Sequence, residues 1–473
     1  MKIAFIQKRT YEKIGVHQIS GCLKNANKDF IIDIFIEELE PNFYDKIATF
    51  KPDFVLYSLF IGEESFVLEA FSKIKEFLPQ VKTIIGGPFT LVFPEIAKRD
   101  EVDFVIRGDG EYSLPLFFKL YEDKKSLHEV PGIYFIQEDG TLFKNDNIRL
   151  TSDLKNIPDP DRDLYYKYES LRNQDTKGFI ASRGCPYNCT YCYNAELKKF
   201  YTESYWRLRD QEAVLREIEY VKNKYGLKWV HFHDGTFNSS IEWLKSFLVE
   251  YKKRGLPPFL CNCRVENINE ESVSLMKQAG CERITFGIQS GNQYIREDIS
   301  GRHMPDKQIE DAFALCKKYN IRVGADIIFG WPGETMEQAM DTINMCRKIK
   351  PDTCHSNVLI PYPGLWITKR AIKEGFLEHE PTFKEIRELD SNKSLIKQKN
   401  IRLLINMDKL FNYLIQFPFI EKFFKFLLHL PPNKFFKFLK NLHLLKRSLK
   451  YDSDDFLSSL KIIRNYIQHY NDA

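Results

Sequence analysis

The chain has 473 residues, more than the roughly 100 to 200 residues of a typical domain, so more than one hydrophobic core is expected. Hydrophobic residues (43%) and charged residues (28%) lie in the usual range for a globular protein and exclude a disordered or collagen-like chain. The net charge is +4, but in residues 401–450 eight Lys and two Arg oppose only Asp408 and Glu421. That segment therefore carries +8, and the remainder carries −4.

The ten cysteines bear on the cellular compartment. The N-terminal sequence MKIAFIQKRTYEK contains no apolar signal segment, and the chain contains no uncharged apolar run of about 18 residues. We therefore expect a cytoplasmic protein without a spanning helix. In a reducing compartment, cysteines that are close in sequence indicate a metal site, whereas scattered ones such as Cys22, Cys316 and Cys346 are small core residues.

Through residue 150, short apolar runs alternate with longer stretches of helical periodicity. The apolar runs are KIAFIQ, DIFIEE, DFVLYSLF, VKTIIGG and DFVIRG. This rhythm over 1–150 predicts a Rossmann-like or flavodoxin-like doubly wound domain, whose ligand crevice lies beyond the carboxyl ends of its parallel strands. The loops at 58–63, 86–90 and 108–112 follow such strands, and their glycines allow a ligand to approach the backbone closely.

Residues 151–175 contain IPDPDRDLYY, whose prolines and aspartates favour an irregular interdomain linker. A second strand–helix series occupies 176–375. Its apolar runs are GFIASR, WVHFHD, FLCNCR, RITFGIQS, VGADIIFG and HSNVLI. Six such runs predict a partial (β/α)6 barrel of the TIM type, with its chemistry at the C-terminal ends of the strands. The predicted fold class is α/β.

From 376 to 473 the sequence predicts a helical C-terminal region that is rich in Phe and Lys. Segments such as EKFFKFLLHL and NKFFKFLKNLHLLKR are amphipathic and have a basic face. One interpretation is a helical cap that packs on the barrel. The other is a peripheral membrane contact through 401–450. Phenylalanines at helical spacing are more typical of buried or membrane-facing surfaces than of nucleic-acid binding, so no nucleic-acid partner is expected.

The stretch SRGCPYNCTYCYN brings Cys185, Cys189 and Cys192 together directly after an apolar run. Three thiolates on one short loop suit a four-iron four-sulfur cluster with one open iron, because cluster iron prefers thiolate ligands. The alternative is a structural zinc site, which requires a fourth ligand. The downstream candidates for that ligand are His231, His233, Cys261 and Cys263. Spacing alone does not separate the two interpretations.

The cysteine loop and the later motifs resemble those of the radical S-adenosylmethionine (SAM) superfamily, specifically its group with an N-terminal cobalamin-binding domain. The resemblance covers most of residues 1–375. It implies a [4Fe-4S] cluster on the three cysteines, whose open iron binds SAM for reductive cleavage to a 5′-deoxyadenosyl radical. The SAM contacts that it implies are Tyr191 beside the third cysteine, Asp234 in HDGTF, Arg264 in FLCNCR, and Gln289 and Ser290 in GIQSG. Gln289 stands where the family usually carries Glu, which leaves a neutral hydrogen bond there.

The N-terminal domain resembles the family's cobalamin-binding domain through IGGP and GDGE. The resemblance implies cobalamin contacts at Gly86, Gly87, Gly108 and Glu111. The Asp-x-His-x-x-Gly motif of many cobalamin proteins does not occur in the sequence. His17 in GVHQISG has a different spacing, so we expect a polar helix residue there rather than a cobalt ligand. A flavodoxin-like domain without a ligand is the alternative.

With both cofactors bound, the sequence predicts C-methylation of an unactivated carbon in a small or lipophilic metabolite, with a reductase or flavodoxin as electron donor. Radical cyclisation or oxidative rearrangement is the alternative within enzymes. A noncatalytic module that binds cobalamin or the cluster is the alternative outside them.

Overall fold

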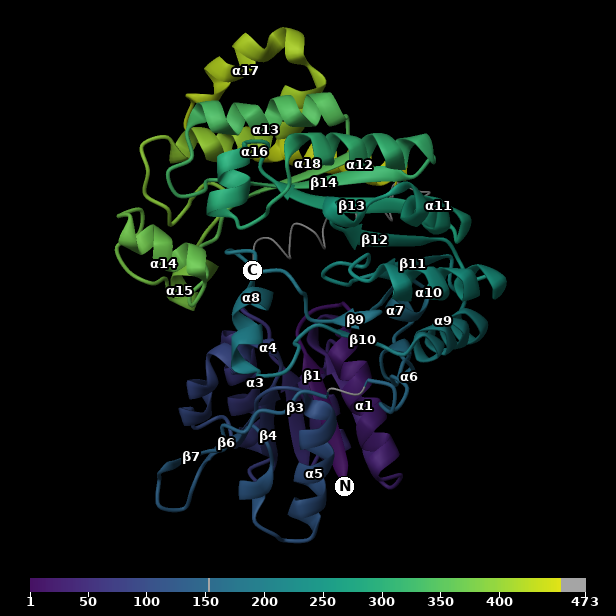
Figure 1. The fold of residues 1–473 in the computed structure, drawn as a ribbon. Coiled ribbons are helices and arrows are strands. Elements are labelled where there is room, and N and C mark those ends of the chain that lie inside the picture. Colours follow the sequence, from purple (N-terminus) through teal and green to yellow (C-terminus); the bar gives the residue numbers. More distant parts are fainter. Residues whose placement is uncertain (152–153, 452–473) are drawn as a thin grey trace. The chain divides into compact units, whose positions relative to one another are not determined.

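The computed structural model describes residues 1–151 and 154–451, which form two compact units (Figure 1). The first unit contains Met1–Pro186, Leu197–Gly235 and Gly255–Pro258. The second contains Tyr187–Glu196, Thr236–Arg254 and the chain from Phe259 onward. The predicted C-terminal region extends to 473, but 452–473 lie outside the described residues.

A seven-stranded sheet forms the centre of the first unit. Its strands are β1 (Lys2–Gln7), β2 (Ile31–Ile36), β3 (Phe54–Ser58), β4 (Lys82–Gly86), β5 (Phe104–Ile106), β6 (Ile133–Ile136) and β7 (Leu142–Lys144). The order is β2-β1-β3-β4-β5-β6-β7; the first five strands are parallel, and β6 and β7 add antiparallel. The central strands are almost entirely buried apolar runs, as expected for strands that are covered on both faces. The predicted doubly wound domain is confirmed.

Helices connect the parallel strands of this sheet. They are α1 (Ile14–Ala26), α2 (Phe43–Phe50), α3 (Glu64–Phe77), α4 (Pro88–Val92) and α5 (Gly110–Glu122). The strand order reverses between β1 and β3, and in doubly wound folds the ligand crevice lies outside the carboxyl ends of the strands at this switch point. The three loops that the sequence analysis identified follow β3, β4 and β5 and therefore open at that edge.

The segment 151–175, expected to be irregular, includes two one-turn helices, α6 (Asp163–Tyr166) and α7 (Glu169–Arg172). Arg162 is fully buried there and forms ion pairs with Glu12 (3.0 Å) and Glu217 (2.6 Å). Two carboxylates compensate the desolvated guanidinium, so this stretch is packed into the first unit rather than running freely over its surface.

The second strand–helix series also has the predicted character. Its strands are β8 (Thr176–Phe179), β11 (Trp229–Phe232), β12 (Phe259–Cys263), β13 (Cys281–Gln289), β14 (Arg322–Phe329) and β15 (Thr353–Val358), and their order in the sheet is their order along the chain. β8 and β11 pair in parallel in the first unit, and β12 to β15 pair in parallel in the second. A sequential parallel sheet with intervening helices is the architecture of a partial barrel. A short antiparallel pair, β9 (Ser182–Arg183) with β10 (Arg207–Leu208), lies in the first unit.

Side-chain caps define where the helices of this series begin. The helices are α9 (Gln211–Tyr225), α10 (Ile241–Lys253), α11 (Glu270–Gln278), α12 (Asp306–Lys318) and α13 (Met336–Ile349). Asp210, Ser240, Asn269 and Thr335 precede four of them, and each side chain accepts a hydrogen bond from a backbone amide of the first turn. Such caps satisfy amides that have no partner inside the helix and contribute about 1 kcal/mol each.

The C-terminal region is helical, as predicted. It contains α15 (Phe383–Arg387), α16 (Ile401–Gln416), α17 (Glu421–Leu428) and α18 (Lys434–Tyr451), and α14 (Trp366–Lys373) precedes it. α16 lies beside α13 and α18 (Figure 1). It also packs on β15, and its Leu404, Met407, Leu410, Phe411 and Leu414 are buried. Among the described residues, no helix combines the length and the hydrophobicity needed to span a bilayer.

Candidate functional site

The three-cysteine loop begins directly after β9, and the short helix α8 (Tyr193–Leu197) follows its last cysteine. Cys189 is buried, whereas Cys185 and Cys192 are partly exposed. Gly184 precedes Cys185 with φ +73°, and a Cβ there would lie 2.4 Å from the carbonyl oxygen of Tyr205. Only glycine fits this turn, which starts the loop.

Two arginines lie beside the Cys189 thiol. The Nη1 atoms of Arg264 and Arg302 are 3.5 Å and 3.4 Å from its Sγ atom. Two guanidinium groups therefore line the sulfur atom of one of the three expected cluster ligands. Within the described part of the chain, no three His, Cys, Asp or Glu side chains are grouped to hold a single metal ion. A cubane does not require such a group, because each thiolate binds a different iron; the donor set of this loop therefore fits a [4Fe-4S] cluster.

The downstream cysteines have a different environment. Cys261 and Cys263 are buried on β12 with their sulfur atoms 3.7 Å apart. Burial raises the pKa of Cys261 well above its ordinary value, and the neighbouring Cys263 and Cys281 add to the shift. This cysteine therefore stays a protonated core thiol, a poor zinc ligand. Cys22, Cys316 and Cys346 are also buried, as expected for core residues.

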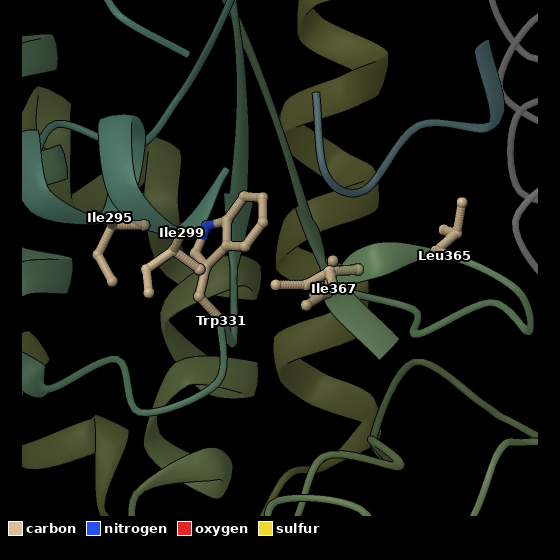
Figure 2. Close-up of a cluster of buried hydrophobic side chains, with 6 residues drawn as sticks. Ile295, Ile299, Trp331, Leu365 and Ile367 are labelled. Carbon is tan, nitrogen blue, oxygen red and sulfur yellow. The ribbon is translucent and has the colours of Figure 1, made fainter. Parts of the chain in front are cut away.

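Tyr191 is held by an aromatic contact and an arginine. Its ring packs edge-on against Trp331 with ring centroids 5.3 Å apart, and Arg302 Nη1 lies 3.4 Å from its hydroxyl oxygen. Trp331 is fully buried, and Figure 2 shows it in a cluster with Ile299 and Ile367. This hydrophobic cluster fixes the position of the Tyr191 ring in the cysteine loop.

Arg264 ends β12 and is 5% exposed, so it is not a surface ion-pair residue. Its guanidinium lies 3.8 Å from the centre of the Tyr187 ring, and its Nε donates to Glu266 Oε1 at 2.9 Å. Arg264 thus joins the cysteine loop to the end of a barrel strand. A carboxylate ligand would have to share this guanidinium with Glu266.

Asp234 follows β11 and is 3% exposed. Its carboxylate accepts hydrogen bonds from the Ala181 amide (3.0 Å) and the Ser182 hydroxyl (2.5 Å). Burial raises the pKa of Asp234, and these hydrogen bonds oppose the shift. Asp234 therefore braces the start of β9, two residues before the cysteine loop begins.

Gln289 has φ +69°, a backbone conformation that non-glycine residues rarely adopt, and the register between β13 and β14 shifts at the same point. Its Nε2 atom and Arg302 Nη2 lie 2.5 Å and 3.4 Å from where a Cβ on Gly287 would stand, so both side chains lie over that glycine. The Ser290 hydroxyl is buried and lies 3.3 Å from Thr342 Oγ1. Strained backbone of this kind concentrates at functional sites.

Arg302 is the site residue that the sequence analysis missed. It is 7% exposed and contacts both Cys189 and Tyr191, and its buried Nε has no hydrogen-bond partner in the part of the chain that the structure describes. The Thr190 amide and hydroxyl bind the carbonyls of Ser300 (3.1 Å) and Ile299 (2.7 Å), which brings the cysteine loop against the turn before Arg302. No motif marks this arginine, because the contact depends on residues more than 100 positions apart.

A cavity at the carboxyl edge of the first unit's sheet contains all four residues expected to contact cobalamin, Gly86, Gly87, Gly108 and Glu111. Gly87 has φ +95°, and a Cβ there would lie 2.7 Å from the Leu59 amide nitrogen. Gly108 has φ +85°, and a Cβ there would lie 2.5 Å from Ile148 Cγ2. Both glycines therefore let the strand-end loops at the edge of the cavity pack closely against neighbouring segments, where a side chain would clash with the protein itself.

The charged groups of this cavity are paired. Glu111 Oε1 lies 2.5 Å from Arg183 Nη2, and Asp109 Oδ2 lies 2.5 Å from Arg207 Nη1.

His17 is fully buried in α1, with its ring nitrogens 2.9 Å from the Asp161 carbonyl and 3.0 Å from Glu12 Oε2. Both nitrogens of His17 are engaged within the protein, in agreement with the expected non-ligand role.

A doubly wound domain with a glycine-lined crevice, followed by a sequential barrel with a three-cysteine loop, defines a class of proteins that combine two cofactor-binding folds. The comparisons with known proteins agree. The B12 binding domain matches residues 8–118, and the radical SAM superfamily matches residues 179–346. The chain therefore carries a radical SAM domain and an N-terminal B12-binding domain, and the cofactors that these two domains imply are a [4Fe-4S] cluster, SAM and cobalamin.

Relatives with assigned names include methyltransferases and a cyclase. The chain is 27% identical over 372 residues to an uncharacterized methyltransferase of Pyrococcus horikoshii, covering 77% of this chain and 79% of that protein. It is 25% identical over 370 residues to the anaerobic magnesium-protoporphyrin IX monomethyl ester cyclase of Cereibacter sphaeroides, covering 74% of this chain and 58% of the cyclase. The solved structure of the radical SAM methyltransferase TsrM from Kitasatospora setae superposes with a TM-score of 0.65 at 16% identity, covering 80% and 79% of the two chains. At that identity the likeness shows a shared fold.

Proposed function

We propose that the protein is a cobalamin-dependent radical SAM methyltransferase that methylates an unactivated carbon of a small or lipophilic metabolite. The observation that carries the proposal is the cysteine loop, in which Arg264 and Arg302 flank Cys189 and a packed Tyr191 adjoins it. When bound, the cluster and SAM supply a 5′-deoxyadenosyl radical, and cobalamin supplies a methyl group.

In this proposal, the residues of the chain orient the cofactors and shield the reaction from water. The cluster is held by Cys185, Cys189 and Cys192. Tyr191 covers one side of the loop that carries these cysteines. Arg264, Asp234, Gln289 and Ser290 contact SAM. Gly86, Gly87, Gly108 and Glu111 line the cobalamin cavity. The functional domains in this proposal are 1–150 for cobalamin, 151–175 as connection, 176–375 for radical chemistry, and 376–473 as a helical region.

The first test is anaerobic purification with iron, sulfide and cobalamin quantitation, followed by detection of 5′-deoxyadenosine after reduction with dithionite and addition of SAM. We expect Cys189→Ala to lose the cubane absorption and SAM cleavage. Cys316→Ala, a buried cysteine away from the loop, is the matched control and should keep both. Retention of the cubane and of SAM cleavage by Cys189→Ala would refute the proposal.

Ring formation is the second candidate, favoured by the similarity to the anaerobic cyclase. A product that carries a methyl group labelled from SAM supports methyl transfer, whereas an unlabelled product with two fewer hydrogens supports cyclisation. A reductase or flavodoxin is the proposed electron donor in either case.

We also propose a peripheral membrane contact through 401–450. Five phenylalanines of the C-terminal helical region are more than half exposed, namely Phe419, Phe423, Phe426, Phe435 and Phe438. Lys422, Lys425 and Lys434 lie among them in the sequence. Exposed aromatic side chains beside lysines suit the interface of an anionic bilayer.

Sedimentation with phosphatidylglycerol vesicles tests this contact on the full chain. We expect Phe426→Ser with Phe438→Ser to reduce binding by at least tenfold, because up to about 2 kcal/mol of apolar burial is lost for each side chain. Val249→Ser removes an exposed apolar side chain elsewhere in the second unit and should leave binding unchanged. Equal sedimentation of all three proteins would exclude the contact.

A further inference from the structure

A second cavity lies wholly within the second unit and adjoins the cysteine loop through Tyr191. Its walls come from the ends of β14 and β15, the segment 386–394, α16 and α18. We propose that this cavity binds the substrate of the enzyme, and that the substrate is an amphipathic acid, with an apolar body and a phosphate or carboxylate group. The inference rests on the proposed radical SAM function and names its substrate class.

The position of the cavity is the first argument. Tyr191 lies between two of the three cysteines in the sequence, and its ring is fixed against Trp331. In partial barrels of parallel strands the chemistry lies at the C-terminal strand ends, and Val358 and Leu359 at the end of β15 line this cavity. A molecule bound here would therefore lie beside the loop that holds the cluster.

The apolar part of the lining is the second argument. Ile328, Val358, Leu359 and Ile360 come from the strand ends, and Ile386, Leu389 and Leu444 come from the C-terminal region. Burial of an apolar body against such walls contributes about 25 cal/mol per Å². This part of the lining recognises a hydrocarbon rather than a sugar or a nucleotide.

The charges are the third argument. Lys393, Lys409, Lys437 and Lys440 line the cavity, against two carboxylates, Asp390 and Asp408. Asp408 accepts hydrogen bonds from Lys440 at 2.8 Å with both oxygens, so this pair is internally neutralised. The lysines outnumber the carboxylates, which favours an anionic ligand.

Lys409 is the central residue of this argument. It is 2% exposed, and within the described chain its ammonium group hydrogen-bonds only to the amide oxygen of Asn392. Burial lowers the pKa of Lys409 to about 8, and Lys437 and Lys440 add to the shift while Asp408 and Asp390 oppose it. A buried ammonium without a carboxylate partner is costly, and a bound anion would complete its hydrogen bonding.

The two faces of α18 connect this cavity with the proposed membrane contact. Lys437, Lys440, Asn441 and Leu444 recur at helical spacing and line the cavity. Phe435 and Phe438, 60% and 58% exposed, lie on a different side of the same helix. One helix therefore presents aromatic rings outward and lysines inward, as suits an acid that is drawn from a lipid surface.

The test measures binding to the full-length, cluster-reconstituted protein by isothermal titration calorimetry with four probes: dodecyl phosphate, dodecanoate, and the two fragments dodecanol and inorganic phosphate. We expect dodecyl phosphate to bind at least tenfold more tightly than either fragment, because only it satisfies both the lysines and the apolar wall. Dodecanoate should bind within tenfold of dodecyl phosphate. Equal affinity for dodecanol and dodecyl phosphate would overturn the assignment of an acidic group.

Two variants locate the binding. Lys409→Met and Lys437→Gln should each weaken dodecyl phosphate binding, by about tenfold or more and by several-fold respectively, while Lys252→Gln, at an exposed lysine of α10 that does not line the cavity, serves as the control. Lys437 is only partly buried, so its replacement tests the site even if Lys409→Met folds poorly. Unchanged affinity in a folded Lys437→Gln and a folded Lys409→Met would overturn the site.

The source of the acid and the underlying function are separated by two further measurements. If phosphatidylcholine vesicles that contain phosphatidic acid displace bound dodecyl phosphate, the acid is a lipid headgroup. If dodecyl phosphate binds and the vesicles do not displace it, the acid is a soluble metabolite. If neither the vesicles nor dodecyl phosphate binds, the proposal is overturned. Reductive SAM cleavage is assayed in parallel. Cleavage without probe binding refutes only the substrate class, whereas absence of cleavage in the cluster-loaded protein refutes the function on which it rests.

Discussion

The two cavities each contain a buried lysine, and the difference between these lysines separates their chemistry. In the first unit, Lys13 donates to Glu63 and to the Ser58 carbonyl, both at 2.7 Å. In the second unit, Lys409 has a neutral amide as its partner. The charged groups of the first cavity are paired, and Gly86 and Gly87 line it, whereas in the second cavity the described structure gives the Lys409 ammonium group no hydrogen bond to a carboxylate. Recognition in the first depends on shape, and in the second on charge.

The largest expected effect comes from straining a strand-end loop that lines the first cavity. Gly87→Ala places a Cβ 2.7 Å from the Leu59 amide nitrogen at φ +95°, a strain of about 1–3 kcal/mol before the clash is counted. We expect a loss of cobalamin affinity of about tenfold to 100-fold, measured by spectrophotometric titration. Gly140→Ala has φ +80° with open space around the new Cβ and should leave the affinity unchanged. Tight cobalamin binding by Gly87→Ala would show that shape is not what this cavity recognises.

Removal of the positive charge beside the cysteine loop should have a smaller effect. Arg302→Gln removes a cation that lies 3.4 Å from Cys189 Sγ. A cation at this position stabilises the reduced, more negative state of the cluster. We expect the cluster's reduction potential to fall by about 60 mV, a tenfold change in its one-electron equilibrium. The measurement is an EPR-monitored redox titration. Arg302→Lys keeps the charge and should restore most of the potential; a potential equal to wild type in Arg302→Gln would contradict this role.

The smallest expected effect is the pH dependence of ligand affinity in the second cavity. An anion binds best to the ammonium form of Lys409, whose pKa of about 8 is below the ordinary value for lysine. Dodecyl phosphate affinity should therefore be full below that pKa and decline above it, by at most about tenfold per pH unit. Lys409→Arg remains charged and should flatten the profile between pH 7 and pH 9. A wild-type profile that is flat over this range would remove Lys409 from the binding group.

The sequence by itself determined the order of strands and helices, the three-cysteine loop and the glycines at the strand ends. Each depends on local rules: apolar periodicity, thiol spacing, and backbone angles that only glycine adopts readily. Gly86, Gly87 and Gly108 were predictable because parallel strands bring their carboxyl ends to one edge. The helices in 151–175 were not, because Arg162 is stabilised there by Glu12 and Glu217, which are distant in sequence.

Only the tertiary structure decided which charged residues matter. Arg302 follows no motif, yet the fold brings it to Cys189 across 113 positions. Lys409 is one of eight lysines in a basic segment, and its sequence neighbours do not distinguish it. What distinguishes it among the described residues is burial without a hydrogen bond to a carboxylate, and the cost of such a charge depends on every group folded around it.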